Sequence, residues 1–199
     1  QLSSIQILDR NGFKETVNAK ERLLTYKNVD FLGPQPYEKV IRMYHRNQEG
    51  KTTARFTSYH KNGGLFQYLD VVNGRACGVY REWHPNGNIR LDVIVLEGLG
   101  DLSEEAQMDW IFDGVSRAWD DRGHLLAEIN YEKGMLQGNA LYYDSNSKLS
   151  KIIPYKQGLV HGDVITYNEK GECNGKASYD YGKKEGFAHF KGDMSSPAY

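Results

Sequence analysis

The residues of this chain that most readily bind metal ions are six histidines and two cysteines. His60 and His84 lie one repeat apart, and Asp120, Asp144 and Asn168 continue the same column. Zinc ligands lie about 2.0–2.2 Å from the metal, whereas equivalent residues two strands apart in a sheet lie about 9–10 Å from each other. We therefore expect no metal site and no cofactor. We expect these polar residues to bond the local backbone where each turn begins.

Cys77 and Cys173 are the residues best suited to nucleophilic catalysis, because a thiolate is a strong nucleophile. Neither has a histidine and a carboxylate in register with it, and the chain contains neither a GxSxG motif nor a phosphate-binding glycine loop. The two cysteines stand about four repeats apart, well beyond the roughly 7 Å limit for a disulfide. We expect two free thiols, a buried or half-buried Cys77, and no catalytic residues.

The elements that position these residues belong to a repeat, which is visible as three columns that share one period. The turn positions Gly63 and Gly87 lie 24 residues apart, the next unit is 12 residues longer, and the period then returns. The three columns read Gly63, Gly87, Gly123, Ser147 and Gly171; Gly74, Gly98, Gly134, Gly158 and Gly182; and Tyr59, Trp83, Trp119, Tyr143 and Tyr167. Glycine supplies the positive φ of a hairpin turn. The turn at Ser147 is therefore strained or of another type.

Alternation after each turn predicts one packed and one solvated sheet face. The second, sixth and eighth residues beyond the turn share one side, and they are Leu65/Leu69/Val71, Ile89/Val93/Val95, Leu125/Ile129/Tyr131, Leu149/Ile153/Tyr155 and Cys173/Ala177/Tyr179. Tyr80 and Tyr142 lie on the side opposite the aromatic column, where they either face a partner or belong to the core.

The longer unit contains an insertion at residues 99–110, and insertions in repeat arrays often project from the face that binds a partner. Asp101 followed by Glu104 resembles a capping box and predicts one or two helical turns. The acidic residues lack the spacing and the glycine of an EF-hand. The insertion is either a solvated loop or a partner-binding element, with candidate contacts at Glu104, Glu105, Met108 and Trp110.

Residues 1–56 are less regular and predict a cap over the edge of the first repeat. We expect a degenerate hairpin over 5–17, a short helix near 19–26 that begins at a capping box of Asn18 and Glu21, and strands over 38–46 and 52–57. The repeat array then covers residues 57–190. The polar tail, 191–199, is expected to be disordered.

Bulk composition agrees with many short strands, since the 199 residues include 21 glycines, 14 tyrosines and only 5 prolines. The formal net charge of −1 favours neither nucleic acid nor acidic lipid. No apolar run reaches about 18 residues, the length of a membrane-spanning helix. Because the chain begins at Gln1 rather than Met, we expect that a preceding segment was removed. An exported or cell-envelope location is slightly favoured over a cytoplasmic one.

These features resemble the MORN repeat, in particular the variant form found in the bacterial YwqK-like antitoxin family. The matching segments are Trp83-His84-Pro85-Asn86-Gly87 and the Tyr-x-x-Gly-x-x-x-Gly segments that begin at Tyr131 and Tyr155. The likeness covers residues 57–190 and departs from the pattern at Ser147, Lys191 and the insertion. It implies an all-β fold, an elongated, curved single antiparallel sheet of stacked β-hairpins with short helical insertions. It also implies protein or membrane-surface association rather than catalysis.

The leading functional hypothesis is a non-enzymatic scaffold or adaptor that binds a protein partner. The alternative is a cell-envelope or membrane-associated repeat protein tethered through a removed N-terminal segment. A glycan hydrolase has only scattered carboxylates in its favour. The open ends of a sheet also predict a homodimer that forms through a terminal strand.

Overall fold

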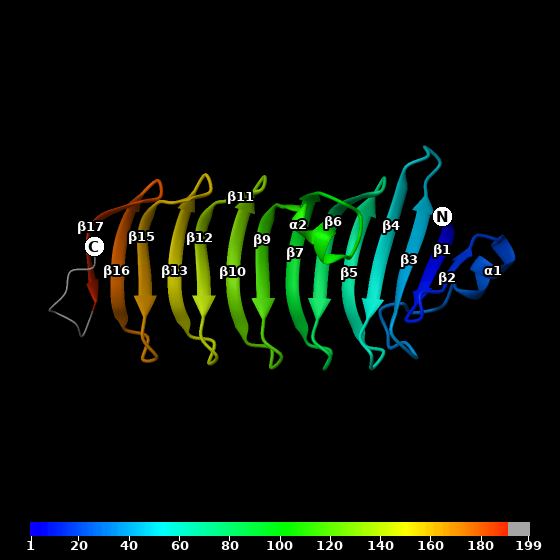
Figure 1. Cartoon of the computed structure of the whole chain (residues 1–199), viewed down its shortest axis with the longest axis horizontal. Coiled ribbons are helices and arrows are strands. Elements are labelled where there is room, and N and C mark those ends of the chain that lie inside the picture. The colour runs from blue at the N-terminus through cyan, green and yellow to red at the C-terminus, as the bar shows by residue number, and fades with distance from the viewer. Residues whose placement is uncertain (191–199) are drawn as a thin grey trace. The chain divides into compact units, whose positions relative to one another are not determined.

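The computed structural model describes residues 1–190, which form seventeen strands and two short helices. All strand pairings between neighbours are antiparallel (Figure 1). The chain divides into two compact units, Gln1–Ile111 and Phe112–Tyr199. The all-β class and the antiparallel hairpin repeats expected from the sequence are confirmed.

Unit 1 is a sheet with the strand order β2-β1-β3-β4-β5-β6-β7. Its strands are β1 (Leu2–Asp9), β2 (Lys14–Val17), β3 (Lys39–Arg46), β4 (Thr52–Tyr59), β5 (Leu65–Val72), β6 (Arg75–Trp83) and β7 (Ile89–Glu97). Its helices are α1 (Lys20–Thr25) and α2 (Glu104–Met108), and the short β8 (Ile111–Phe112) follows. The first helix and the two strands predicted for the cap form within two residues of their expected bounds, and the predicted hairpin begins three residues earlier, at Leu2.

Unit 2 continues the repeat as a second series of hairpins. Its strands are β9 (Gly114–Trp119), β10 (Leu125–Glu132), β11 (Met135–Leu136), β12 (Gly138–Tyr143), β13 (Leu149–Lys156), β14 (Leu159–Val160), β15 (Gly162–Tyr167), β16 (Cys173–Asp180) and β17 (Lys183–Phe190). The long strands pair in the order β9-β10-β12-β13-β15-β16-β17. The predicted disordered tail, 191–199, lies outside the described residues.

The polar residues at the start of the turns were expected to bond the local backbone, and three of them do. Asp144 Oδ1 accepts the backbone N–H groups of Asn146 and Lys148 at 2.8 and 3.0 Å, and Asp120 and Asn168 do the same in their own turns. His60 behaves differently, because its Nε2 lies 2.7 Å from the carbonyl oxygen of Trp83 in the next repeat. This column therefore has a structural role in the turns, and one of its histidines links neighbouring hairpins.

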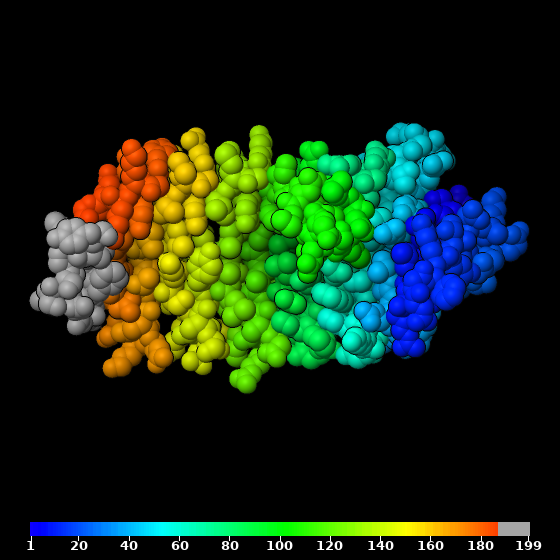
Figure 2. Space-filling view, viewed as in Figure 1, coloured from blue at the N-terminus to red at the C-terminus, as the bar shows by residue number. Residues whose placement is uncertain are grey.

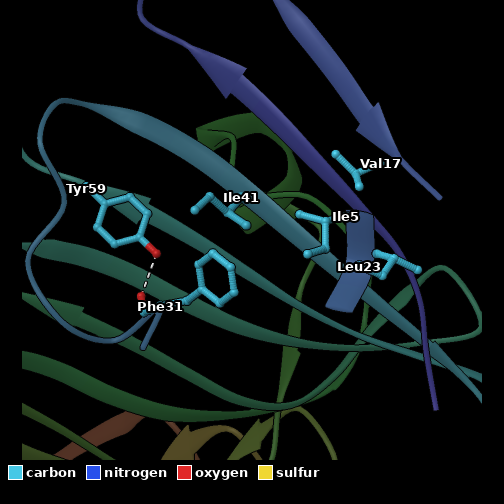
Figure 3. Packing of buried hydrophobic residues seen from close by; sticks show 6 residues of the cluster. All are labelled: Ile5, Val17, Leu23, Phe31, Ile41 and Tyr59. Atoms are coloured by element: carbon cyan, nitrogen blue, oxygen red, sulfur yellow. Dashed lines mark hydrogen bonds between the residues drawn. The ribbon is translucent and has the colours of Figure 1, made fainter. Parts of the chain in front are cut away.

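One of the two cores of unit 1 lies under the cap, between α1, the following loop and one face of the sheet (Figure 3). It is formed by the buried side chains of Ile5, Val17, Leu23, Phe31, Ile41 and Tyr59. The hydroxyl of Tyr59 donates to the carbonyl oxygen of Phe31 at 2.5 Å and lies 3.0 Å from the hydroxyl of Thr57. Burial raises the pKa of Tyr59 to about 12. The phenol therefore stays protonated and fixes the loop on the sheet.

Three local predictions are wrong. The first helix begins at Lys20 with Ala19 as its N-cap and without a side-chain cap, so Asn18 does not form a capping box. Cys77 is exposed rather than buried or half-buried, and Cys173 is exposed although its phase placed it on the packed face. Both thiols are free, as expected from their separation. Alternation assigns a strand residue to a face but does not say whether anything covers that face.

The turn glycines Gly63 and Gly87 offer a matched test of how the cap meets the array. Both have a left-handed φ, 84° and 90°, but a Cβ at Gly63 would lie 1.8 Å from the carbonyl oxygen of Gln35, whereas Gly87 has open space. We expect Gly87→Ala to cost about 1 kcal/mol of unfolding free energy from backbone strain, and Gly63→Ala about 2–4 kcal/mol. Urea denaturation measures both values. Equal losses would contradict a cap seated on this turn.

Ser147 occupies a turn position with φ of 62°, a conformation that costs energy for any residue with a Cβ. We expect Ser147→Gly to raise the unfolding free energy by about 0.5–1 kcal/mol. Ser145→Gly is the control, because Ser145 lies in the same turn without a positive φ. Thermal or urea unfolding should separate the two variants, and a stabilised Ser145→Gly would assign the effect to something other than relief of strain.

Candidate functional site

The candidate site is one face of the repeat sheet, which we call the repeat face. In unit 1 the paired register puts Phe56 opposite Leu69, Leu69 opposite Tyr80, and Tyr80 opposite Val93, so all four side chains share this face. The equivalent residues in unit 2 are Ser116, Ile129, Ala140, Ile153, Val164 and Ala177. This face forms the second core of unit 1 and carries Leu69 and Val71, the sixth and eighth residues of the predicted packed face. The second residue, Leu65, packs against the cap core instead, because a bulge shifts the register between Ser58 and Tyr59.

The insertion covers the repeat face of unit 1 and lies over its central strands (Figures 1 and 2). Leu102, Ala106 and Trp110 are buried beneath it, with exposed fractions of 8, 2 and 7%. The ring of Trp110 meets that of Tyr80 edge-on at 4.7 Å, and its Nε1 donates to the carbonyl oxygen of Leu99 at 2.8 Å. The insertion is therefore a packed part of the fold and not a solvated loop.

Polar contacts fix the insertion on the sheet. Gln67 Nε2 donates to the hydroxyl of Tyr80 at 2.9 Å and to the carbonyl oxygen of Leu102 at 3.3 Å. The Tyr80 hydroxyl in turn donates to Glu82 at 2.6 Å. Burial, and then this bond to Glu82, raise the pKa of Tyr80 well above its usual value. The buried tyrosine is thus protonated and fully bonded, which suits a structural role.

An ion pair adds a charge contact between sheet and insertion. Arg42 on β3 lies on the repeat face opposite Phe56, with its guanidinium 5.1 Å from that ring. Its Nη2 also lies 3.0 Å from Oδ1 of Asp101 in the insertion. Asp101 therefore pairs with the sheet and does not cap the helix as predicted. The N-cap of α2 is Ser103, whose Oγ accepts the N–H of Ala106 at 3.2 Å.

The backbone of the insertion comes so close to the sheet that only glycine fits at two positions. A Cβ at Gly98 would lie 2.4 Å from Cδ1 of Trp110, and one at Gly100 would lie 2.4 Å from the carbonyl oxygen of Gly74. Gly98 also has a φ of 158°. These contacts explain why a short segment can seal a sheet face.

The repeat face of unit 2 has no insertion over it, since both helices of residues 1–190 belong to unit 1. Ile129, Ile153, Val164 and Ala177 are only partly buried there, whereas Leu69 and Val93 of unit 1 are buried. The position of Tyr80 is occupied in unit 2 by small or medium side chains. The predicted packed face is thus confirmed in unit 1 and remains partly open in unit 2.

Tyrosines gather on this open face. Tyr131, Tyr142 and Tyr155 share the face by register, and Tyr131 packs on Phe112 with ring centres 5.4 Å apart. Burial and the nearby Tyr155 raise the pKa of both Tyr131 and Tyr142, and Tyr131 adds to the effect on Tyr142. The phenols are therefore close neighbours, and the raised pKa values of Tyr131 and Tyr142 keep both protonated at neutral pH.

The six predicted partner-binding residues separate into two groups. Tyr80 and Trp110 are buried, with exposed fractions of 1 and 7%, and contact each other. Glu104, Glu105 and Met108 lie exposed on α2, and Tyr142 is half-buried in unit 2. The structure does not bring these four together. Sequence reasoning did not select Arg42, Gln67 or Lys151, because single polar residues on a strand carry no periodic signal.

Further chemistry is sparse. Among the side chains of residues 1–186, no three His, Cys, Asp or Glu groups come together as a metal site would require. None of the helices in this part of the chain is long and apolar enough to cross a membrane.

The geometry defines an all-β protein built from antiparallel hairpin repeats whose shared face is packed in one unit and open in the other. The family model described as MORN repeat variant matches residues 76–93, in β6 and β7, and residues 136–157, from β11 to β13. One segment in each unit therefore resembles the MORN repeat variant. Searches of curated proteins and of solved structures gave no match.

Trp110 and Met108 provide a matched pair for testing the packed insertion. Trp110 is 7% and Met108 88% exposed, although they stand only two residues apart. We expect Trp110→Ala to lower the unfolding free energy by about 3–5 kcal/mol, because it removes a buried aromatic side chain. Met108→Ala should change it by less than about 0.5 kcal/mol. Urea denaturation measures both changes. A small loss of unfolding free energy for Trp110→Ala would show that the insertion does not seal the sheet.

Proposed function

We propose that this protein is a non-enzymatic interaction module in which the repeat face of unit 2 binds a segment of a partner protein. One observation carries the proposal. The same face of the same repeat is sealed in unit 1 by the protein's own insertion and is left with half-buried apolar and tyrosine side chains in unit 2. The non-catalytic character of MORN repeats supports the same reading.

The insertion serves as an internal example of what this face accepts. It brings an apolar side consisting of Leu102, Ala106 and Trp110 and forms a single short helix. Where unit 1 has the large Tyr80, unit 2 has the buried Ser116 and Ala140 and the half-buried Val164, so no large side chain of the repeat stands at this position. Tyrosines next to these small residues supply large contact area at little cost in side-chain entropy.

Charge on the face favours an acidic partner segment. Lys151 lies opposite Tyr142 on the repeat face of unit 2 and forms no ion pair with any of residues 1–190. In unit 1 the cation on this face, Arg42, is paired with Asp101 of the insertion. By analogy, the partner segment carries apolar side chains on one side and a carboxylate in reach of Lys151.

Site-specific photocrosslinking tests the proposal. A photoreactive phenylalanine analogue replaces Tyr142 on the repeat face or, as the control, Leu126, which is 37% exposed and is the bulged residue of β10, outside the paired register of the repeat face. We expect one protein from the native source to crosslink through position 142 and not through position 126. Absence of any specific crosslink at 142, or the same products from both positions, would contradict the proposal.

Replacement of tyrosine area should weaken the interaction without unfolding the sheet. We expect Tyr142→Ser combined with Tyr155→Ser to reduce capture of the crosslinked partner at least about tenfold, the size of effect typical of aromatic hot spots. Leu126→Asn should leave capture unchanged. Circular dichroism confirms that each variant remains folded, and full capture by a folded double variant would place the partner elsewhere.

The terminal strand β17 also supports self-association, as proposed from the sequence. Among the described strands it pairs only with β16, through backbone positions such as Lys176 and His189. An open strand edge can pair with a second copy. We expect light scattering to report a dimer at high protein concentration. A strict monomer across the accessible concentration range would contradict pairing through this edge.

A further inference from the structure

A groove beside α1 lies apart from the repeat face and plays no part in the proposed function. It consists of two adjoining cavities of about 540 and 620 Å³, which share Gln1, Leu2, Lys20 and Leu23 in their walls. We call this feature the α1 groove. It runs beside the helix along strands β1 and β3, so its walls come from the cap and not from the repeats.

The two cavities differ in chemistry. The first is mainly apolar, with Leu2, Leu23, Leu24 and Met43 in its walls. The second has a mixed lining, in which Asn18, Arg46 and Asn47 stand beside the shared Leu2 and Leu23. An apolar compartment thus opens directly into a mixed one, which is the arrangement required by a ligand with a tail and a head.

The apolar compartment is incompletely covered by the protein itself. Leu24 is 67% and Val29 43% exposed, although both line the same cavity as the buried Leu23. Exposed apolar side chains scattered singly are ordinary. Here they border one concave surface that continues into the cap core.

The charged side chains that line the α1 groove are all positive. Lys20, Lys27 and Arg46 line it, no acidic side chain does, and none of the three forms an ion pair within residues 1–190. The nearest ion pair of α1, between Arg22 and Glu15, joins other residues. His45 also lines the apolar cavity, and burial, followed by nearby positive charge, lowers its pKa, so it is neutral at pH 7. The complementary ligand is therefore anionic.

We propose that the α1 groove binds a single-chain anionic amphiphile, such as a free long-chain fatty acid. Its alkyl tail lies against Leu2, Leu24 and Met43, and its carboxylate reaches Lys20 and Arg46. A free ligand is favoured over a membrane surface because the apolar walls form a cavity between a helix and a sheet and do not form a protruding apolar face. No bond forms or breaks on binding.

Calorimetric titration of the 199-residue chain with dodecanoate, tetradecanoate and hexadecanoate, each below its aggregation concentration, tests the assignment. We expect saturable binding of one ligand per chain, with affinity that rises by up to about fourfold per added methylene. Dodecyltrimethylammonium and dodecyl maltoside carry the same tail with a cationic or a neutral head. They should bind at least about tenfold more weakly than dodecanoate, and equal binding of all three heads would overturn the proposal.

Two exposed leucines give matched variants. Leu24→Glu places a carboxylate in the groove, whereas Leu159→Glu makes the same change in unit 2, at a residue that is 48% exposed. We expect Leu24→Glu to weaken tetradecanoate binding at least about tenfold and Leu159→Glu to leave it unchanged. Arg46→Glu should weaken binding of the carboxylate ligand and not that of dodecyl maltoside. Equal losses in the two leucine variants would overturn the site.

Sedimentation with vesicles of phosphatidylcholine and phosphatidylserine separates the two sources of an anionic lipid. We expect no sedimentation that depends on Leu24. Vesicle binding lost in Leu24→Glu, together with no binding of free fatty acid, would replace the proposal by a membrane contact. Failure of fatty-acid binding leaves the repeat-face crosslinks unaffected, so the two proposals succeed or fail separately.

Discussion

A single-layer sheet with rows of apolar side chains on its surface requires other parts of the protein, or a partner, to bury them. The rest of this structure depends on that constraint. Hairpins with a period of 24 residues place equivalent side chains in register along one face. No second sheet packs against them in either unit. In unit 1 the protein covers one face with the loop and helix of the cap and the other with a short insertion.

The contact between Tyr80 and Trp110 shows how the repeat strands and the insertion depend on each other. Tyr80 is large where the equivalent residues of unit 2 are small, and it is the residue on which the insertion packs. Gly98 and Gly100 allow the backbone to approach, and Arg42 and Gln67 satisfy polar atoms beneath it. Unit 2 lacks the insertion and retains the open face, which is why binding is proposed there.

Much of the fold follows from the sequence because hairpin repeats are local. The turn glycines, the alternation and the cap hairpin all depend on neighbours within one or two strands, and each formed close to its expected bounds. Burial on a given face was not predictable in the same way. Ala177 and Leu69 occupy equivalent positions on the same face, yet Ala177 is partly buried and Leu69 is buried, because the insertion covers this face only in unit 1. The pairing of Asp101 with Arg42 likewise joins residues 59 positions apart.

Hydroxyl-radical footprinting of tyrosines in the isolated chain tests most directly the claim that one unit is sealed and the other open. The account predicts slow oxidation of Tyr80 and faster oxidation of Tyr142 and Tyr155. In Trp110→Ala, Tyr80 should become reactive while the rates in unit 2 stay unchanged. Protection of Tyr142 and Tyr155 equal to that of Tyr80 in the unmodified chain would contradict the account.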